Sequence, residues 1–130
     1  MQKVFKFLKQ AGTYYLATTE GDQPRVRPFG TILEYDGKLY IQTGRPKEVT
    51  KQLEANPKAE LSAFDGEKWI RVACTLVMDN RIEVQEEMLN AYPDLRKMYT
   101  PGDDHTTTYY MKDVTAAIYA FGGEPEVIKW

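Results

Sequence analysis

Two Asp-Gly pairs, each placed between strand-like segments, constrain the fold of this chain more than any other feature. Asp36-Gly37 lies between RVRPFGTILEY and KLYIQT, and Asp65-Gly66 lies between AELSAF and KWIRVACTLVM. An Asp-Gly pair supplies the positive φ angles of a tight turn, which joins two neighbouring antiparallel strands. The sequence therefore predicts a sheet that is built largely from hairpins.

Apolar residues at helical spacing appear in three short stretches. The first stretch ends at Gly12. The second opens at Pro46, since proline fits the first helical position, and it ends before Pro57. The third is expected to follow a cap at Asp79 or Asn80. The apolar residues that define the first and third helices are Val4, Phe5, Leu8 and Ala11, and Val84, Met88, Ala91 and Leu95.

The other extended segments are YYLATT, TTYYM, AAIYAF and EVIKW. A loop is expected over residues 100–108, and a break between strands is expected near Lys112-Asp113. Pro28 and Gly30 favour a bulged or edge strand in their segment rather than a central one, because proline has no N–H to donate to a neighbouring strand. Hairpins with short helices between them predict an antiparallel barrel decorated with helices rather than a βαβ array.

Length and composition narrow the class of protein. With 130 residues the chain suits one domain, residues 1–130, and its net charge of −2 does not favour nucleic acid as a partner. No apolar run approaches the length of a membrane span, and the first residues lack the apolar core of a signal peptide. A single cysteine allows no internal disulfide, so a reducing, cytoplasmic location is expected.

The start of the second helix carries an unusual concentration of positive charge. Arg45 and Lys47 occupy a position where the helix dipole is already positive and where acidic residues are usual. Lys47, Thr50 and Lys51 are spaced to share one helical face, and Thr43 ends the strand before them. The pattern predicts an anion site, with a phosphate monoester as the best match. A solvated basic helix face is the alternative that the spacing leaves open.

Two strands carry further candidate residues. Arg25 and Arg27 alternate, so both are expected on one strand face, opposite either an anion or carboxylates. In KWIRVACTLVM one face is predicted to be core, and the other carries Trp69 and Arg71. That second face indicates a subunit interface or a ligand wall. The residues of the predicted core face are Ile70, Val72, Cys74, Leu76 and Met78.

Two residues that could carry chemistry are expected to be structural. Cys74 is predicted to be a buried small hydrophobe rather than a nucleophile. His105, the only histidine, lies beside Asp103 and Asp104 but has no second histidine with which to complete a typical metal site. No nucleophile elbow or glycine-rich phosphate loop is present.

The order of these segments resembles the FMN-binding split-barrel superfamily of pyridoxamine 5′-phosphate oxidase-like proteins. The features that carry the resemblance are RVRPFG, the turn at Asp36-Gly37, YIQT, the segment KEVTKQLEANPKAEL, WIRV and AYPDLRKMY. Within the superfamily, the chain is most similar to the nitroimidazole-resistance-like branch. The resemblance implies a six-stranded antiparallel split β-barrel of Greek-key type that forms a homodimer, with FMN in each interface groove.

The resemblance also implies a set of FMN contacts. One stretch of β-structure would line the flavin, Gln42 and Thr43 would border its ring and ribityl chain, and Lys47 and Thr50 would hold the phosphate with Lys51 nearby. Two residues would approach from the partner subunit. The full set is Arg25, Val26, Arg27, Pro28, Gln42, Thr43, Lys47, Thr50, Lys51, and Trp69 and Arg71 from the partner.

Departures from the family pattern limit the function that is expected. Many members carry Ser and Lys two residues apart where this chain has Lys47 and Val49. The C-terminal EPEVIKW lacks the Arg- and Pro-bearing segment of true pyridoxamine phosphate oxidases, and Gln42 stands where nitroimidazole reductases carry His. The expected function is an FMN-dependent oxidoreductase acting on a small molecule, with NAD(P)H as a candidate donor. A non-catalytic flavin-binding protein, or a relative that binds haem or a deazaflavin, are the alternatives.

Overall fold

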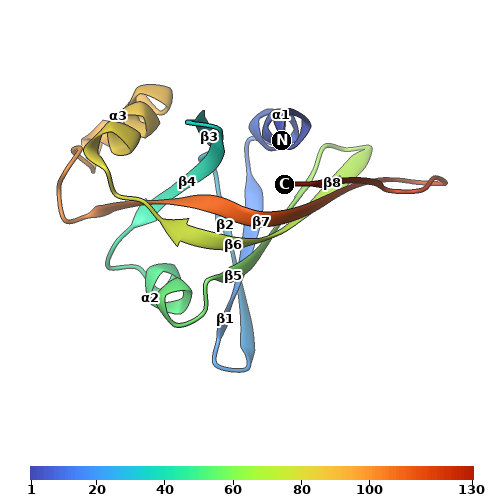
Figure 1. Ribbon diagram of the computed structural model, residues 1–130, viewed down its shortest axis with the longest axis horizontal. Helices are drawn as coiled ribbons and strands as arrows, with labels where there is room; N and C mark the ends of the chain where they lie inside the picture. Colours follow the sequence, from blue (N-terminus) through green and yellow to red (C-terminus); the bar gives the residue numbers. More distant parts are fainter.

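The structure, a computed structural model, describes residues 1–130 and is mainly β with three short helices (Figure 1). This confirms the predicted class. The helices are α1 (Gln2–Ala11), α2 (Glu48–Ala55) and α3 (Ile82–Ala91), and the 3₁₀ helix η1 (Pro93–Lys97) follows α3. The strands are β1 (Tyr14–Glu20), β2 (Gln23–Phe29), β3 (Leu33–Tyr35), β4 (Lys38–Gly44), β5 (Lys58–Phe64), β6 (Lys68–Met78), β7 (Thr106–Ala120) and β8 (Glu126–Lys129).

All eight strands belong to one antiparallel sheet in the order β2-β1-β5-β6-β7-β4-β3, and β8 pairs with β7. The count differs from the six strands that the resemblance implies. Six strands have seven or more residues, whereas β3 has three and β8 has four. The two short strands therefore account for the difference.

The hairpin predictions are confirmed. Asp36 and Gly37 have φ angles of 53° and 72° and join β3 to β4, as a two-residue turn of this kind requires. β5 and β6 pair across Asp65-Gly66. The edge position expected from Pro28 is also correct, because β2 ends the strand order and pairs only with β1.

Two predictions about β7 were wrong. The expected loop over residues 100–108 ends earlier, because residues 106–108 already pair with β4. The expected break near Lys112-Asp113 is instead a local irregularity inside one 15-residue strand. The register against β6 shifts between Ala73 and Thr75, and Asp113 has a positive φ of 52°, which is typical of a β-bulge.

Three details of the third helix and of β6 also differ from prediction. Arg81, not Asp79 or Asn80, is the N-cap of α3, although Arg81 N–H donates to Asp79 Oδ1 at 3.3 Å. The helix stops at Ala91, which is exposed, so Leu95 belongs to η1 instead. Met78 is 43% exposed at the end of β6, outside the core that the alternation implied.

The two ends of the sheet meet through the short segment that follows β2. Gln42 N–H in β4 donates to Thr31 Oγ1 at 3.0 Å, and the Thr31 hydroxyl lies 3.3 Å from Gln42 O. The Tyr14 hydroxyl of β1 donates to Thr31 O at 2.6 Å. β3 covers only residues 38–40 of β4, so the rest of this edge of β4 has no strand partner. Thr31 therefore joins the sheet ends without closing the ladder.

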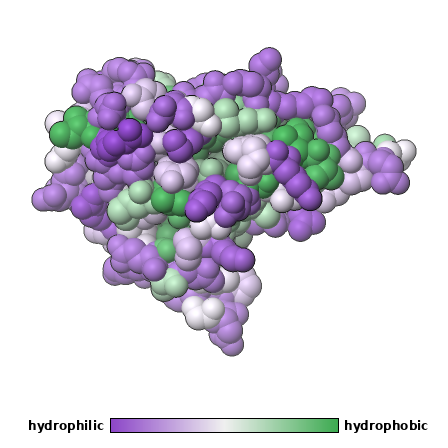
Figure 2. Space-filling model, in the orientation of Figure 1, coloured by the Kyte–Doolittle hydropathy of each residue, from purple (hydrophilic) through white to green (hydrophobic).

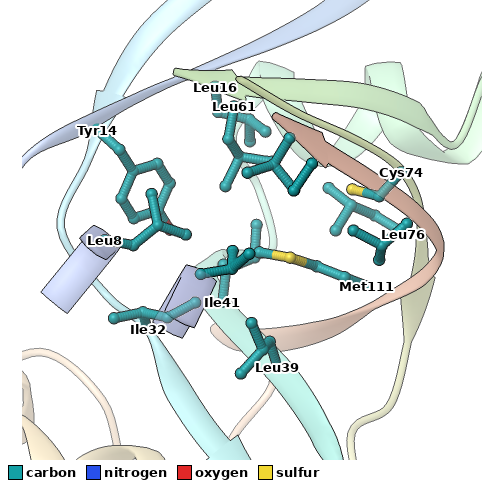
Figure 3. Packing of buried hydrophobic residues seen from close by; sticks show 14 of the residues in the cluster. Leu8, Tyr14, Leu16, Ile32, Leu39, Ile41, Leu61, Cys74, Leu76 and Met111 are labelled. Atoms are coloured by element: carbon teal, nitrogen blue, oxygen red, sulfur yellow. The ribbon is translucent and has the colours of Figure 1, made fainter. Parts of the chain in front are cut away.

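One apolar core fills the space inside the curled sheet. Its main cluster contains 20 buried residues, and Figure 3 shows side chains from α1 and several strands converging on one space. Leu16, Leu61 and Val72 belong to this cluster and are fully buried. In Figure 1, α1 and α3 lie on one side of the long strand β7 and α2 lies on the other.

The outer surface has a different character. On the face shown in Figure 2, hydrophilic residues dominate and hydrophobic residues form separate patches. None of the helices is long and apolar enough to span a membrane.

Leu61→Ala should lower the free energy of unfolding by about 2–5 kcal/mol, because Leu61 is fully buried and its truncation leaves a cavity. Urea denaturation followed by circular dichroism measures the change. Lys6→Ala is the control, since Lys6 is exposed on α1, and it should alter the value by no more than about 0.5 kcal/mol. Equal effects of the two substitutions would contradict the assignment of Leu61 to the core.

Cys74 should not react with a thiol reagent in the folded protein. It is 7% exposed, and burial, followed by the nearby Glu60, raises the pKa of its thiol to about 12. Only about one thiol in ten thousand is then ionised near pH 8, and the thiolate is the reactive form. Labelling with Ellman's reagent should need denaturant, and full labelling in native buffer would contradict this placement.

Candidate functional site

A cavity of about 350 Å³ opens where the two ends of the sheet meet, and we call it the split cavity. One wall is the end of β2 and the segment after it, and a second is the end of β4. A third is the segment around η1. The lining residues are Pro28, Phe29, Gly30, Thr31, Gln42, Thr43, Lys47, Tyr92, Leu95, Met98 and Tyr99.

The start of α2 lies beside this cavity, with a geometry that corrects the sequence prediction. The helix begins at Glu48 rather than at Pro46, and Lys47 is its N-cap with extended angles of φ −75° and ψ 155°. A turn precedes the helix, because Lys47 N–H donates to Gly44 O at 3.2 Å. Lys47 therefore does not share a helical face with Thr50, as its spacing had suggested.

A second cavity, of about 410 Å³, lies at this helix start, and we call it the helix cavity. Its lining residues are Arg27, Pro46, Lys47, Glu48 and Val49. Lys47 is the residue that the two cavities share. A ligand could therefore place a polar group in one cavity and a larger group in the other, with Lys47 in contact with both.

Positive charge at the helix start has no internal counterion. None of the ion pairs in the structure includes Arg27, Arg45 or Lys47. No side chain caps α2, so the N–H groups of Glu48 and Val49 also lack an acceptor. Unpaired cations together with free N–H groups form a donor set that suits an anion.

Arg27 is the most constrained of these cations. Its guanidinium donates to Leu16 O at 3.1 Å, to Thr18 Oγ1 at 2.8 Å and to Gln52 Oε1 at 2.6 Å. All three acceptors are neutral. Burial, and then the neighbouring Arg25, lower the pKa of Arg27, which means that its charge is held at a cost. An anion in the helix cavity would offset that cost.

Gln42 and Thr43 present free polar atoms to the split cavity. The Gln42 side-chain amide donates to Thr43 O and to Thr106 Oγ1, both at 3.1 Å, which fixes its orientation and leaves Oε1 without a donor. Both residues are buried, at 6% and 5% exposure. The Thr43 hydroxyl forms no hydrogen bond within the chain. These groups can bind the polar edge of a ligand.

Gly44 makes room for two of the side chains that line the split cavity. A Cβ at this position would lie 3.0 Å from the Tyr99 hydroxyl and 3.4 Å from Lys47 Cε. Its backbone conformation is open to any residue, so the constraint here is space. The absent side chain lets Lys47 and Tyr99 lie against the end of β4.

Four of the predicted contacts thus line the split cavity, and Arg27 and Lys47 line the helix cavity. The structure places other predicted residues elsewhere. Arg25 pairs with Glu20 at 2.9 Å, which is the carboxylate alternative that the sequence left open. Val26 is 68% exposed on β2 and lines neither cavity.

Thr50 and Lys51 also lie outside both cavities. Thr50 is 1% exposed, and its hydroxyl donates to Gly44 O at 2.9 Å. Lys51 is exposed and pairs with Glu48 at 3.2 Å. It lines a separate polar cleft that also includes Gln52.

Trp69 and Arg71 lie on the outer face of β6, away from both cavities of their own chain. Trp69 stacks on Tyr119 with ring centroids 5.3 Å apart, and Arg71 pairs with Glu60 at 3.1 Å. His105 is exposed and lines neither cavity. No cluster of three or more His, Cys, Asp or Glu side chains is placed to hold a metal ion.

The wall around η1 was given no role from the sequence, although AYPDLRKMY contributed to the resemblance. Tyr92, Leu95 and Met98 recur every third residue in that segment. This spacing could have indicated a 3₁₀ helix with one apolar face. The α-helical spacing that joins Val84, Met88, Ala91 and Leu95 does not detect this row.

Comparisons with known proteins identify the family to which this fold belongs. The model of the family described as pyridoxamine 5′-phosphate oxidase matches residues 1–110. The crystal structure of a NimC/NimA family protein from Clostridium acetobutylicum is 43% identical, with a TM-score of 0.96, over 100% of this chain and 92% of that one. Comparison with curated proteins gives no match.

Two more distant structures share the fold. A pyridoxamine 5′-phosphate oxidase-related, FMN-binding protein from Nostoc punctiforme is 16% identical, with a TM-score of 0.67, over 97% of this chain and 82% of that one. A haem-binding protein from Mycobacterium smegmatis is 13% identical, with a TM-score of 0.68, over 94% of this chain and 57% of that one.

The family match covers most of the sequence, and the 43% identity extends over the whole chain. Both results confirm the resemblance that the order of the segments indicated. The chain therefore belongs to the pyridoxamine 5′-phosphate oxidase family, within its NimC/NimA branch.

Proposed function

We propose that this protein binds FMN across the split cavity and the helix cavity and acts as an oxidoreductase on a small molecule. The observation that carries the proposal is the position of Lys47, an unpaired cation that both cavities share. FMN has a dianionic phosphate at one end and a flat ring with a polar edge at the other, so it needs two such environments. The FMN-binding relative from Nostoc punctiforme supports the proposal at the level of the fold.

The phosphate would be held in the helix cavity. Arg27 and Lys47 provide charge, and the N–H groups of Glu48 and Val49 provide donors at the positive end of α2. Hydrogen bonds from charged donors to a phosphate are shorter and stronger than neutral ones. We leave Thr50 and Lys51 out of this set, because their side chains are engaged elsewhere.

The ring and the ribityl chain would be held in the split cavity by Pro28, Gln42 and Thr43. Gln42 Oε1 can accept a hydrogen bond from a ring N–H group, and the Thr43 hydroxyl can form a hydrogen bond with a ribityl hydroxyl. Bound FMN supplies hydride or electron transfer, which no side chain of the protein offers. The chain's own part is to orient the cofactor and to exclude water around it.

A homodimer is the second part of the proposal. Phe64 and Tyr119 lie opposite Trp69 in the strand register, and the Phe121 ring is 5.2 Å from that of Trp69. Phe64 is 60% exposed and Phe121 is 82% exposed. An aromatic patch of this kind favours burial against a partner. Trp69 and Arg71 of one chain would then reach the cavities of the other.

Other activities have less support. A haem-binding protein shares the fold, but His105, the only histidine here, lines neither cavity. A deazaflavin would use the same basic residues as FMN, and a flavin carrier without turnover would use the same contacts. Oxidation of NAD(P)H by the FMN-loaded protein separates an enzyme from a carrier, because a carrier should give no oxidation above that of free FMN.

Lys47→Ala should weaken FMN binding by about 1.5–3 kcal/mol, because it removes a charged hydrogen bond to the phosphate. This corresponds to a dissociation constant that is roughly 10- to 150-fold higher. Quenching of FMN fluorescence during titration of the FMN-free protein measures it.

Lys51→Ala is the matched control. It also removes a lysine side chain near the start of α2, but Lys51 is paired with Glu48. It should change FMN affinity by no more than about twofold. If both variants bind FMN as the wild type does, the phosphate does not lie at this helix start.

Sedimentation should give twice the mass of one chain at micromolar concentration, and Trp69→Glu should shift the protein toward the monomer. A carboxylate placed in the aromatic patch would lose its hydration on association without gaining a partner. Lys6→Glu, on exposed α1, should leave the dimer intact. A monomeric wild-type protein would rule out contributions from a partner subunit.

A further inference from the structure

The segment Tyr92–Tyr99 forms the one wall of the split cavity that the FMN contacts leave unused. It contributes Tyr92, Leu95, Met98 and Tyr99 to the lining. None of these residues is needed to hold the phosphate or the polar edge of the ring. The wall is therefore available to a second molecule in the same cavity.

Backbone geometry aligns three of these side chains. Leu95 N–H donates to Tyr92 O at 3.0 Å, and Met98 N–H donates to Leu95 O at 3.0 Å. Hydrogen bonds of this type make about three residues per turn, so side chains three apart lie in one row. We call Tyr92, Leu95 and Met98 the η1 row, and all three face the cavity.

Both ends of the segment are fixed to the rest of the protein. The Tyr92 hydroxyl accepts from Ile32 N–H at 3.0 Å and donates to Ile32 O at 3.1 Å. At the other end, the Tyr99 hydroxyl lies against Gly44, where a Cβ would approach it to 3.0 Å. The row is thus anchored directly beside Thr31 and the end of β4.

The charged residues of the same segment point away from the cavity. Asp94, Arg96 and Lys97 are exposed and do not line it, and Arg96 donates to Asn90 Oδ1 at 2.7 Å. Met98, by contrast, is 65% exposed although it is apolar and belongs to neither core cluster. The wall therefore offers apolar contact but no counterion.

We infer that the η1 row is the substrate wall of this site, and that it selects a flat, uncharged, apolar molecule. The inference rests on the proposed function, because it assigns the remaining wall of the proposed cofactor cavity. A charged molecule would lose hydration against this wall without gaining a partner, because none of the wall's side chains is charged and Lys47, the only charged residue that lines the cavity, is assigned to the FMN phosphate. A cavity of about 350 Å³ that is shared with the planar ring of a cofactor favours a small, planar second molecule.

Equilibrium dialysis with menadione, an uncharged planar quinone, tests the assignment on the FMN-loaded protein. A naphthoquinone sulfonate of similar shape should bind at least about tenfold more weakly, because its charge has no partner at the wall. Met98→Glu should lower menadione affinity by at least about tenfold while it changes FMN affinity by less than about twofold. Met98 is largely exposed, so the variant is expected to fold.

Lys97→Glu is the matched control, since it places the same carboxylate one residue away and off the row. It should change neither affinity. The inference fails if Met98→Glu binds menadione as the wild type does, if the sulfonate binds as tightly as menadione, or if the wild type binds neither quinone. Parallel loss of FMN and menadione in Met98→Glu would also overturn it, because the wall would then belong to the cofactor.

FMN dialysis on the same samples separates this inference from the proposed function. If the wild-type protein binds no FMN, the proposed function fails. Menadione binding to the FMN-free wild type and to FMN-free Met98→Glu still shows whether the η1 row binds this molecule, because the row is anchored without any cofactor. Loss of menadione binding in the variant alone would support the row, and equal binding would overturn it.

Discussion

The junction at Thr31 is the contact on which the site depends. Thr31 accepts a hydrogen bond from the Tyr14 hydroxyl of β1 and forms hydrogen bonds with the backbone of Gln42 at the free edge of β4. It therefore joins the β2-β1 end of the sheet to β4. Side-chain bonds of this kind hold the sheet ends together without filling the space between them. A continuous backbone ladder would have brought the strands into contact and removed the cavity. Tyr92 anchors to the neighbouring Ile32, so the same junction also positions the third wall.

Charge is the feature that supports the proposal of a phosphorylated ligand in this space. Other cations, such as Arg25, Lys51 and Arg71, have carboxylate partners. Around the start of α2, Arg27 and Lys47 have none, and Arg27 is held by neutral acceptors with its pKa lowered by burial. Cations without a carboxylate partner are therefore gathered beside a helix start that has no side-chain cap.

Sequence patterns predicted the parts of this structure that local rules control. Asp36-Gly37 specified its hairpin because few other residues adopt the required positive φ angles, and Pro28 indicated an edge strand. The same rules could not show that Lys47 caps α2 instead of lying on its face, because the turn that shifts the helix start depends on tertiary packing around Gly44. These rules also could not show that Arg25 pairs with Glu20 while Arg27 stays unpaired. Both arginines occupy the same face of an alternating strand, so the pattern does not distinguish them. The η1 row was missed because its period of three is that of a 3₁₀ helix, whereas α-helical spacing groups Leu95 with Val84, Met88 and Ala91.

Whether the two cavities bind FMN is tested most directly by the absorbance spectrum of the purified protein after it has been mixed with FMN and desalted. Flavin bands should correspond to about one FMN per chain, because each chain supplies one pair of cavities that share Lys47. Haem added in the same way should be lost on desalting. A spectrum without flavin bands, or a Soret band that is retained after haem is added, would contradict the assignment of these cavities to FMN.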